Sequence, residues 1–308
     1  MILVTGASGL LGTNVVALAR AQGREVAGLY HRHEAILPGA TLLPADLMDE
    51  SALSRVFHDL KPEAVVHCAA ATHVDWCQEH PEEAHRINVA ATARIAEITA
   101  QNAAQLLYIS TDAVFDGSRG HYSESDRPAP VNVYADTKLR GEREVLRFNP
   151  RAVVARVTLY GWNAQSKQSL AEWVLGQLIL GKPVPGFTDV IFCPILANDV
   201  AEILLTMLDR KLAGTFHVVG SEAVSKYEFA RRVAAAFGFD PGQVFSAKSN
   251  DSKLKAPRPR DTSLNTERVC TALGCSMPDV NAGLHKFFRL QPEGTMERLK
   301  SHVTGVRE

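Results

Sequence analysis

The sequence predicts an α/β fold, a doubly wound parallel sheet with a smaller C-terminal lobe. Short apolar runs rich in β-branched residues alternate with stretches of helical periodicity through the first half of the chain. A glycine-rich turn, Thr5-Gly6-Ala7-Ser8-Gly9-Leu10-Leu11-Gly12, joins the first run to the first helical stretch. Repeated strand–helix–strand units favour a parallel sheet with helices on both faces.

The first half supplies most of the sheet. Its predicted strands are runs that are apolar on both faces, Ile2–Thr5, Glu25–Tyr30, Ala64–Ala69, Leu106–Ser110 and Ala152–Thr158. The predicted helices between them are Leu10–Ala21, Glu50–Leu60 and Pro81–Asn102.

The second half is less regular. It is predicted to hold helices at Ser169–Leu180, Ala197–Leu208 and Tyr227–Phe237 and a strand at Thr215–Val219. Asn198 and Asp199 are expected to cap the second of these helices. We expect residues 1–160 to form a dinucleotide-binding domain, to which elements near 196–222 return. Residues 161–308 then form mainly a substrate-binding lobe over the carboxyl edge of the sheet.

Composition narrows the class of protein. The 308 residues include 33 basic and 34 acidic side chains, so neither nucleic acid nor an anionic membrane is an expected partner. Met1-Ile2-Leu3-Val4 leads straight into the glycine turn and no apolar run is long enough to span a membrane, so a cytoplasmic protein is expected. The cysteines form no CxxC pair and the histidines are scattered, so no metal site is expected.

The glycine turn has the spacing of a dinucleotide site. Gly6 permits a tight turn, Gly9 lets the backbone approach phosphate, and Gly12 lets the helix pack closely on the sheet. The N-terminus of the following helix offers N–H groups and the positive end of its dipole. The predicted pyrophosphate contacts are Gly6, Ser8, Gly9, Leu10, Leu11 and Gly12.

The residues after the second predicted strand indicate which dinucleotide binds. After Tyr30 the chain reads His31-Arg32-His33, where NAD sites usually place an acid for the ribose 2′-hydroxyl. Arg32 is suited to bind a 2′-phosphate, so NADP is the predicted cofactor and NAD the alternative. Asp46 and Leu47, after the third strand, are expected to line the adenine pocket.

Tyr134 and Lys138 lie four residues apart, on one face of a predicted helix. A ketone that accepts a hydride develops negative charge on its oxygen and needs a proton donor. A tyrosine has a pKa of about 10, which a neighbouring ammonium lowers by stabilising the phenolate. Lys138 is also placed to hold the nicotinamide ribose. The hydroxyl of Thr111, at the end of a predicted strand, is placed to orient the carbonyl.

These motifs resemble those of extended short-chain dehydrogenases/reductases and, within them, the dTDP-4-dehydrorhamnose reductases, sugar-nucleotide reductases of dTDP-rhamnose biosynthesis. Besides the glycine turn, the matching stretches are Ala70–Asp75, Ser110–Gly117, Tyr122–Glu124, Tyr134–Glu142, Arg156–Gly161 and Arg258-Pro259. They span nearly the whole chain.

The resemblance implies roles for particular residues. Thr111, Tyr134 and Lys138 would form the catalytic triad. The strand end Ala69, Ala70 and Ala71 would line the cofactor. Thr72, Val74, Asp75 and Arg258 would contact a sugar-nucleotide substrate. Members of this family often pair, so the resemblance is compatible with a homodimer, but the sequence itself does not give the oligomeric state.

Three departures from the family pattern leave the substrate open. Leu159 stands where such reductases often place a tryptophan that stacks on the nucleobase. Phe192-Cys193-Pro194-Ile195 replaces the usual Gly-x-Pro-Thr. Thr13-Asn14 lacks the acid that some members use to bridge a dimer through magnesium.

Other functions remain open on the same residues. A sugar-nucleotide 4,6-dehydratase would place a glutamate where this chain has Ala113, so dehydration is disfavoured. A sugar-nucleotide 4-epimerase remains an alternative. So does a regulatory subunit, because the β subunit of methionine adenosyltransferase is similar to these reductases. The polar pair Thr111-Asp112 favours an active enzyme.

Overall fold

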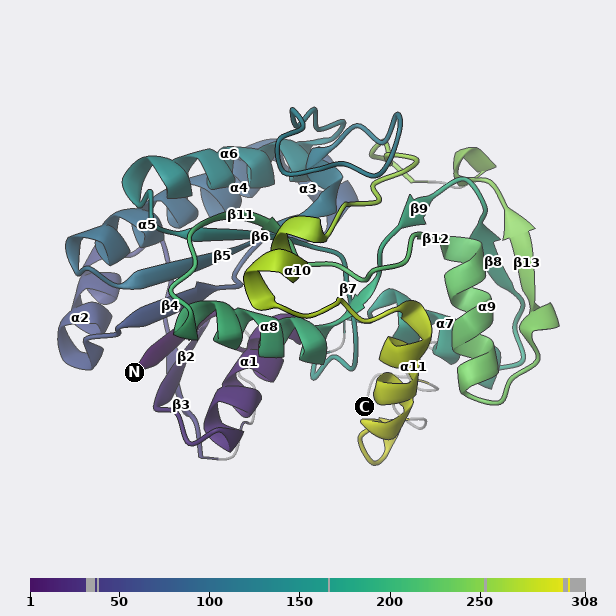
Figure 1. Cartoon of the computed structure of the whole chain (residues 1–308), viewed down its shortest axis with the longest axis horizontal. Coiled ribbons are helices and arrows are strands. Elements are labelled where there is room, and N and C mark those ends of the chain that lie inside the picture. Colours follow the sequence, from purple (N-terminus) through teal and green to yellow (C-terminus); the bar gives the residue numbers. More distant parts are fainter. Residues whose placement is uncertain (32–36, 38, 166, 252–253, 296–298, 300–308) are drawn as a thin grey trace.

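A computed structural model describes residues 1–31, 37, 39–165, 167–251, 254–295 and 299 of the chain. Its centre is a sheet of seven parallel strands in the order β11-β6-β5-β4-β1-β2-β3 (Figure 1). The strands are β1 (Ile2–Thr5), β2 (Val26–Tyr30), β3 (Thr41–Pro44), β4 (Ala64–His67), β5 (Gln105–Thr111), β6 (Val153–Val157) and β11 (Gly214–His217). The predicted doubly wound parallel sheet is confirmed.

The sheet is buried on both faces because alternate residues of each strand enter different cores. Ile2 and Val4 belong to one core, whereas Leu3 between them belongs to the other. The first core is covered by α1 (Leu10–Ala21), α8 (Ala197–Asp209) and α10 (Glu267–Leu273). The second is covered by α2 (Glu50–Leu60), α5 (Ala91–Gln101) and α6 (Val133–Phe148).

The helix predicted at Pro81–Asn102 is interrupted. The structure has α4 (Pro81–His85), a π-helical turn η1 (Arg86–Ala90) and then α5. Such wide turns inside helices often occur at functional sites. Here the wide turn contains Asn88, whose amide bonds the loop after β4 instead of facing solvent.

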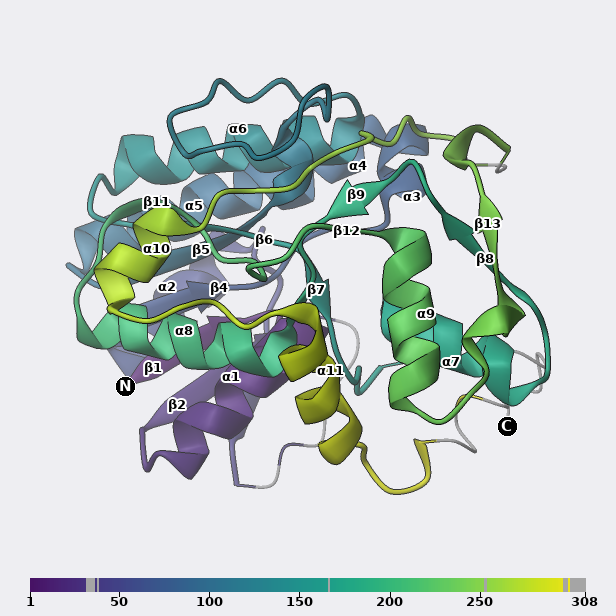
Figure 2. The same cartoon turned by 45° about the vertical axis from the view of Figure 1, so that its right-hand side comes forward.

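The smaller lobe has its own apolar core, beside the carboxyl ends of the strands (Figure 2). Phe229, Phe287 and Tyr160 lie in this core and are buried. Its helices are α7 (Leu170–Ile179), α9 (Lys226–Ala236) and α11 (Val280–Arg289). Its strand pairs are β7 (Leu159–Tyr160) with β10 (Ile195–Leu196), β9 (Ile191–Phe192) with β12 (Val224–Ser225), and β8 (Val184–Phe187) with β13 (Val244–Ala247).

The capping role expected for Asn198 and Asp199 is wrong. Leu196 occupies the N-cap position of α8, and both predicted caps lie inside the helix. Asn198 Nδ2 donates to Asn14 Oδ1 at 2.7 Å, and Asp199 accepts from Lys286 Nζ at 2.6 Å. These side chains tie α8 to α1 and α11, which a local capping rule does not foresee.

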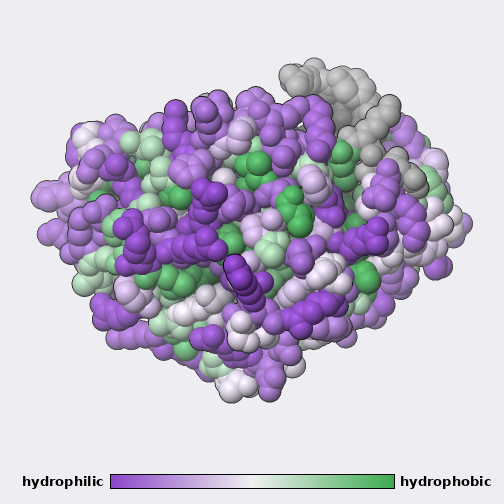
Figure 3. Space-filling model, turned by 90° about the horizontal axis from the view of Figure 1, so that it is seen from above, coloured by the Kyte–Doolittle hydropathy of each residue, from purple (hydrophilic) through white to green (hydrophobic). Residues whose placement is uncertain are grey.

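Within the described part of the chain, no helix is long and apolar enough to cross a membrane. The face seen in Figure 3 is mostly hydrophilic, and its hydrophobic residues form small separate groups.

Phe229→Ala tests the separate core of the smaller lobe. Removing this buried ring should lower the free energy of unfolding by about 3–5 kcal/mol. Phe245→Ala on β13 is the matched control, because Phe245 is 48% exposed and should cost less than about 0.5 kcal/mol. Equal losses in denaturant unfolding would contradict the core assignment.

Candidate functional site

The sheet order brings the predicted site residues to one edge. Strands β1, β4 and β5 are neighbours, so the segments that follow them meet at the carboxyl edge of the sheet. Gly6 follows β1, Ala69 to Ala71 follow β4, and Thr111 ends β5. Tyr134 and Lys138 come to the same edge from α6.

The glycine turn is a cradle that larger residues would fill. A Cβ atom on Gly6, which has a φ of +63°, would lie 2.8 Å from the Cα atom of Ala69. A Cβ atom on Gly12 would lie 2.2 Å from the carbonyl oxygen of Gly6. Gly9 is the N-cap of α1 and has no side chain to bond the first N–H groups of the helix. The turn therefore fits a pyrophosphate at this helix N-terminus.

The structure describes some, but not all, of the other residues that were predicted to bind the cofactor. Arg32 lies outside the described residues. Asp46 and Leu47 follow β3, and the Asp46 carboxylate accepts a hydrogen bond from the backbone N–H of Met48 at 2.9 Å. Leu47 packs on the core beneath, whereas Asp46 is exposed. Ser8 and Leu11 are buried within the turn and the start of α1.

Tyr134 lies near Thr111, close enough for the Thr111 hydroxyl to affect the pKa of the phenol. Burial raises the pKa of the Tyr134 phenol, the Thr111 hydroxyl lowers it, and the nearby Asp112 carboxylate raises it again. The pKa of Tyr134 is raised overall, so the expectation that Lys138 lowers it is wrong, and Tyr134 keeps its proton at neutral pH. The fold therefore brings the phenol near the hydroxyl that was predicted to orient a carbonyl.

Lys138 is a buried cation one helical turn beyond Tyr134. Its side chain is 3% exposed, and its ammonium lies 4.1 Å from the centre of the Tyr108 ring. Burial lowers the pKa of Lys138 to about 7, while the Glu142 carboxylate and the Cys68 thiol raise it. The charge of Lys138 is therefore sensitive to its neighbours near neutral pH.

Asp112 holds the side chain of Thr111. Thr111 Oγ1 donates to Asp112 Oδ1 at 3.1 Å, and Thr262 Oγ1 donates to Asp112 Oδ2 at 2.5 Å. Burial raises the pKa of Asp112, and these hydroxyl bonds lower it. The carboxylate thus fixes the Thr111 side chain and joins β5 to the segment that contains Thr262.

Sequence reasoning missed Asn88. Its side chain is completely buried and makes three hydrogen bonds. Asn88 Oδ1 accepts from the Ala71 N–H at 2.8 Å, and Nδ2 donates to the Ala71 carbonyl at 3.1 Å and to Thr137 Oγ1 at 3.0 Å. Asn88 therefore joins the loop after β4 to the helix of Tyr134 and Lys138. The available signal was an asparagine within an apolar helical stretch, Ile87-Asn88-Val89.

The predicted substrate residues Asp75 and Arg258 lie against each other. Asp75, in α3 (Val74–Glu79), accepts from Arg258 Nη2 at 2.9 Å and from the Ala256 N–H at 3.0 Å. Asn132, which caps α6, donates to the Pro257 carbonyl at 3.0 Å. We call residues 254–265 the strap, because they run from the smaller lobe over this edge of the sheet (Figure 2).

Two further cations were missed. Lys167, in the loop after β7, donates a hydrogen bond to Thr72 in the loop after β4. Lys226 begins α9, and burial and the charge of Arg258 lower its pKa while Asp112 raises it. Both lysines come from the smaller lobe and lie near predicted site residues.

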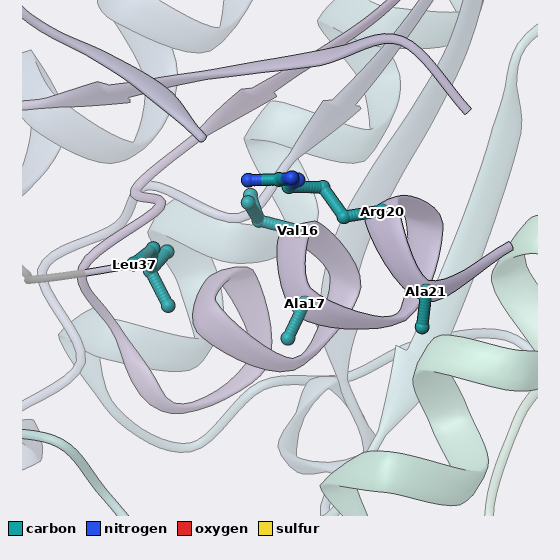
Figure 4. A pocket seen from close by; sticks show the side chains of 5 residues that line it. All are labelled: Val16, Ala17, Arg20, Ala21 and Leu37. Atoms are coloured by element: carbon teal, nitrogen blue, oxygen red, sulfur yellow. The ribbon is translucent and has the colours of Figure 1, made fainter. Parts of the chain in front are cut away.

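Surface hollows lie elsewhere. One is beside the outer side of α1 and is lined by Val16, Ala17, Arg20, Ala21 and Leu37 (Figure 4). Another is lined by Asn14, Asn198 and Trp162 together with residues 290 and 292–295. Among the described residues, no group of three His, Cys, Asp or Glu side chains is placed to hold a metal ion.

The fold and this edge of the sheet define a Rossmann-type dehydrogenase/reductase of the extended short-chain class. Residues 1–291 match the family described as RmlD substrate binding domain. The chain belongs to this family, which confirms the resemblance to sugar-nucleotide reductases.

The similarity to individual relatives covers most of this chain and most of each relative. A probable low-salt glycan biosynthesis reductase, Agl14 of Haloferax volcanii, is 35% identical over 91% of this chain and 95% of that protein. Methionine adenosyltransferase 2 subunit beta of Bos taurus is 32% identical over 88% of this chain and 81% of that protein. The crystal structure of dTDP-4-dehydrorhamnose reductase from Bacillus anthracis in complex with NADP is similar with a TM-score of 0.83 and 25% identity, over 94% of this chain and 99% of that one.

Asn88→Ala tests the link between the two halves of the site. It leaves the Ala71 backbone groups without a buried partner and should lower the free energy of unfolding by about 2–3 kcal/mol. Asn102→Ala is the matched control, because Asn102 is exposed and makes a single side-chain bond to Ile98. Urea unfolding compares the two variants, and equal stability would contradict the role given to Asn88.

Proposed function

We propose that the protein is an oxidoreductase that reduces the ketone of a 4-keto sugar nucleotide with NADPH. The observation that carries the proposal is the meeting of Thr111, Tyr134 and buried Lys138 at one edge of the sheet, beside the glycine cradle. These groups are the ones that a carbonyl reduction needs at a single edge of the sheet.

The cradle supports the cofactor assignment. Gly6, Gly9 and Gly12 would hold the pyrophosphate, Asp46 and Leu47 the adenosine, and Lys138 the nicotinamide ribose. When bound, NADPH supplies the hydride. NADP in the structure of the Bacillus anthracis relative supports this choice, and NAD is the alternative. Arg32 would distinguish the two through the 2′-phosphate.

Residues of the protein carry out the proton transfer to the carbonyl oxygen. Thr111 orients the carbonyl oxygen, and the Tyr134 hydroxyl donates its proton to that oxygen as negative charge develops. Lys138 in its ammonium form stabilises the resulting phenolate. Without substrate the Thr111 hydroxyl donates to Asp112 at 3.1 Å, so its single proton would turn to the carbonyl oxygen when the ketone binds.

The substrate would lie between the sheet edge and the smaller lobe. Thr72, Val74, Asp75 and Arg258 are its proposed contacts, and Lys167 adds a cation beside Thr72. In this division residues 1–160, with elements near 196–222, bind the cofactor, and residues 161–308 mainly bind the substrate. A dTDP-linked 4-keto sugar, by similarity to the Bacillus anthracis reductase, is the first substrate to try, followed by sugar nucleotides of glycan biosynthesis. A cytoplasmic homodimer stays a prediction.

A regulatory subunit is the second candidate, supported by the similarity to methionine adenosyltransferase 2 subunit beta. In that case Tyr134 would take part in no reaction. The protein would co-purify with an adenosyltransferase and would not oxidise NADPH. A 4-epimerase uses the same site residues and would show no net consumption of NADPH.

Tyr134→Phe removes the proton donor and should lower turnover about 10²–10⁴-fold while leaving NADPH affinity intact. Thr111→Val should also lower turnover, whereas Thr111→Ser keeps the hydroxyl and should retain most of it. Initial rates of NADPH oxidation with 4-keto sugar nucleotides measure the effect. Equal rates for wild type and Tyr134→Phe would refute the triad.

Arg32→Ala should weaken NADPH binding about ten- to a hundredfold and leave NADH binding unchanged, because a charge-assisted bond to the 2′-phosphate is lost. Arg24→Ala is the control, since Arg24 pairs with Asp209 at 2.6 Å. Fluorescence titration with both cofactors decides the assignment, and an unchanged preference in Arg32→Ala would refute it.

Asp75→Asn and Arg258→Gln should raise the KM for the sugar nucleotide about tenfold or more and leave NADPH affinity unchanged. Lys255→Gln is the control from the same strap, because Lys255 is exposed and pairs with Glu79. Loss of NADPH binding in a folded Arg258→Gln protein would place the strap against the cofactor instead.

A further inference from the structure

A buried ion pair lies beneath the catalytic helix. Arg156 on β6 donates to Glu142 on α6 through Nε at 3.0 Å and through Nη2 at 2.8 Å. Ser110 Oγ donates to the same carboxylate at 2.5 Å. Glu142 and Arg156 are each 4% exposed. A pair taken out of water in this way is costly, and apolar residues of similar volume often serve stability as well or better.

The position of Glu142 relates it to the proposed site. Glu142 lies one helical turn beyond Lys138, which lies one turn beyond Tyr134, so the three residues follow one face of α6. Gly141 lets the ring of Tyr108 pack closely, because a Cβ atom there would lie 2.4 Å from the Tyr108 hydroxyl. The ammonium of Lys138 rests over that ring.

The titratable groups around Lys138 come from several elements. Burial lowers the pKa of His67 on β4 to about 3, and burial raises the pKa of Cys68 after β4 to about 12. Burial also raises the pKa of Tyr108 on β5 and of Tyr134 on α6. All four are therefore neutral at neutral pH. Among the described groups named here, Glu142 alone brings negative charge to Lys138.

We propose that Glu142 is a positioning residue whose buried carboxylate, fixed by Arg156 and Ser110, keeps Lys138 an ammonium one helical turn from Tyr134. The inference rests on the proposed function, in which that ammonium holds the ribose and stabilises the phenolate. It assigns the buried ion pair a part in the reaction, beyond joining α6 to β6.

The test is the pH dependence of NADPH binding without substrate, followed by fluorescence in wild type and Glu142→Gln. Loss of the carboxylate makes the ammonium easier to deprotonate. The pH at which NADPH affinity falls should therefore move down by about one unit, and the basic limb of kcat should move with it. Ser110→Ala is the control, since it removes a bond to Glu142 but keeps the charge, and its midpoint should stay at the wild-type value.

A second variant guards against a folding defect. Glu142→Gln combined with Arg156→Met leaves no unpaired charge in the interior and should still show a downward shift, smaller than in Glu142→Gln alone because loss of the Arg156 cation favours the ammonium of Lys138. A wild-type midpoint in both Glu142 variants would overturn the proposal. Failure of the wild type to reduce any ketone would contradict the proposed function instead, because the NADPH titration needs no substrate.

Discussion

The amide of Asn88 holds together the parts on which the site depends. The loop after β4 carries the proposed cofactor and substrate contacts, whereas α6 carries Tyr134, the proposed proton donor, and Lys138. Asn88 bonds Ala71 in the loop at 2.8 and 3.1 Å and Thr137 on the helix at 3.0 Å. Because the amide is completely buried, water does not replace these bonds, and loop and helix keep a fixed separation.

The strap makes a comparable connection to the smaller lobe. It reaches α3 through Arg258 and Asp75, the cap of α6 through Pro257 and Asn132, and the end of β5 through Thr262 and Asp112. A substrate in this position would be enclosed by residues from distant parts of the chain. The residues that would select the substrate come together only through long-range contacts, so the family pattern alone does not identify the substrate.

Local features allowed much of the fold and part of the site to be predicted. The bounds of β1, α1 and α2 agree with the sequence analysis, because glycine spacing and apolar periodicity are local properties. The fold brings Thr111 at the end of β5 and Tyr134 on α6 to the same edge of the sheet. The roles given to these residues stay predictions.

What the sequence could not provide depends on partners far along the chain. Asp199 looks like a cap by position, yet it bonds Lys286, 87 residues away. Lys167 looks like a loop charge until the fold brings it to Thr72, and nothing local predicts a π-helical turn at Asn88. Burial also depends on the whole fold. The residues next to Lys138 in the sequence do not show that burial lowers its pKa to about 7.

The most direct test of a hydride-transfer site at this edge is isotopic. The protein is incubated with a 4-keto sugar nucleotide and NADPH that carries deuterium at the transferable C4 position of the nicotinamide, and the product is examined by mass spectrometry. The account predicts one deuterium on the new carbinol carbon of the sugar, and none when Tyr134→Phe replaces the wild type for the same short time. A reduced sugar without deuterium, or no reduced sugar from any ketone offered, would contradict it.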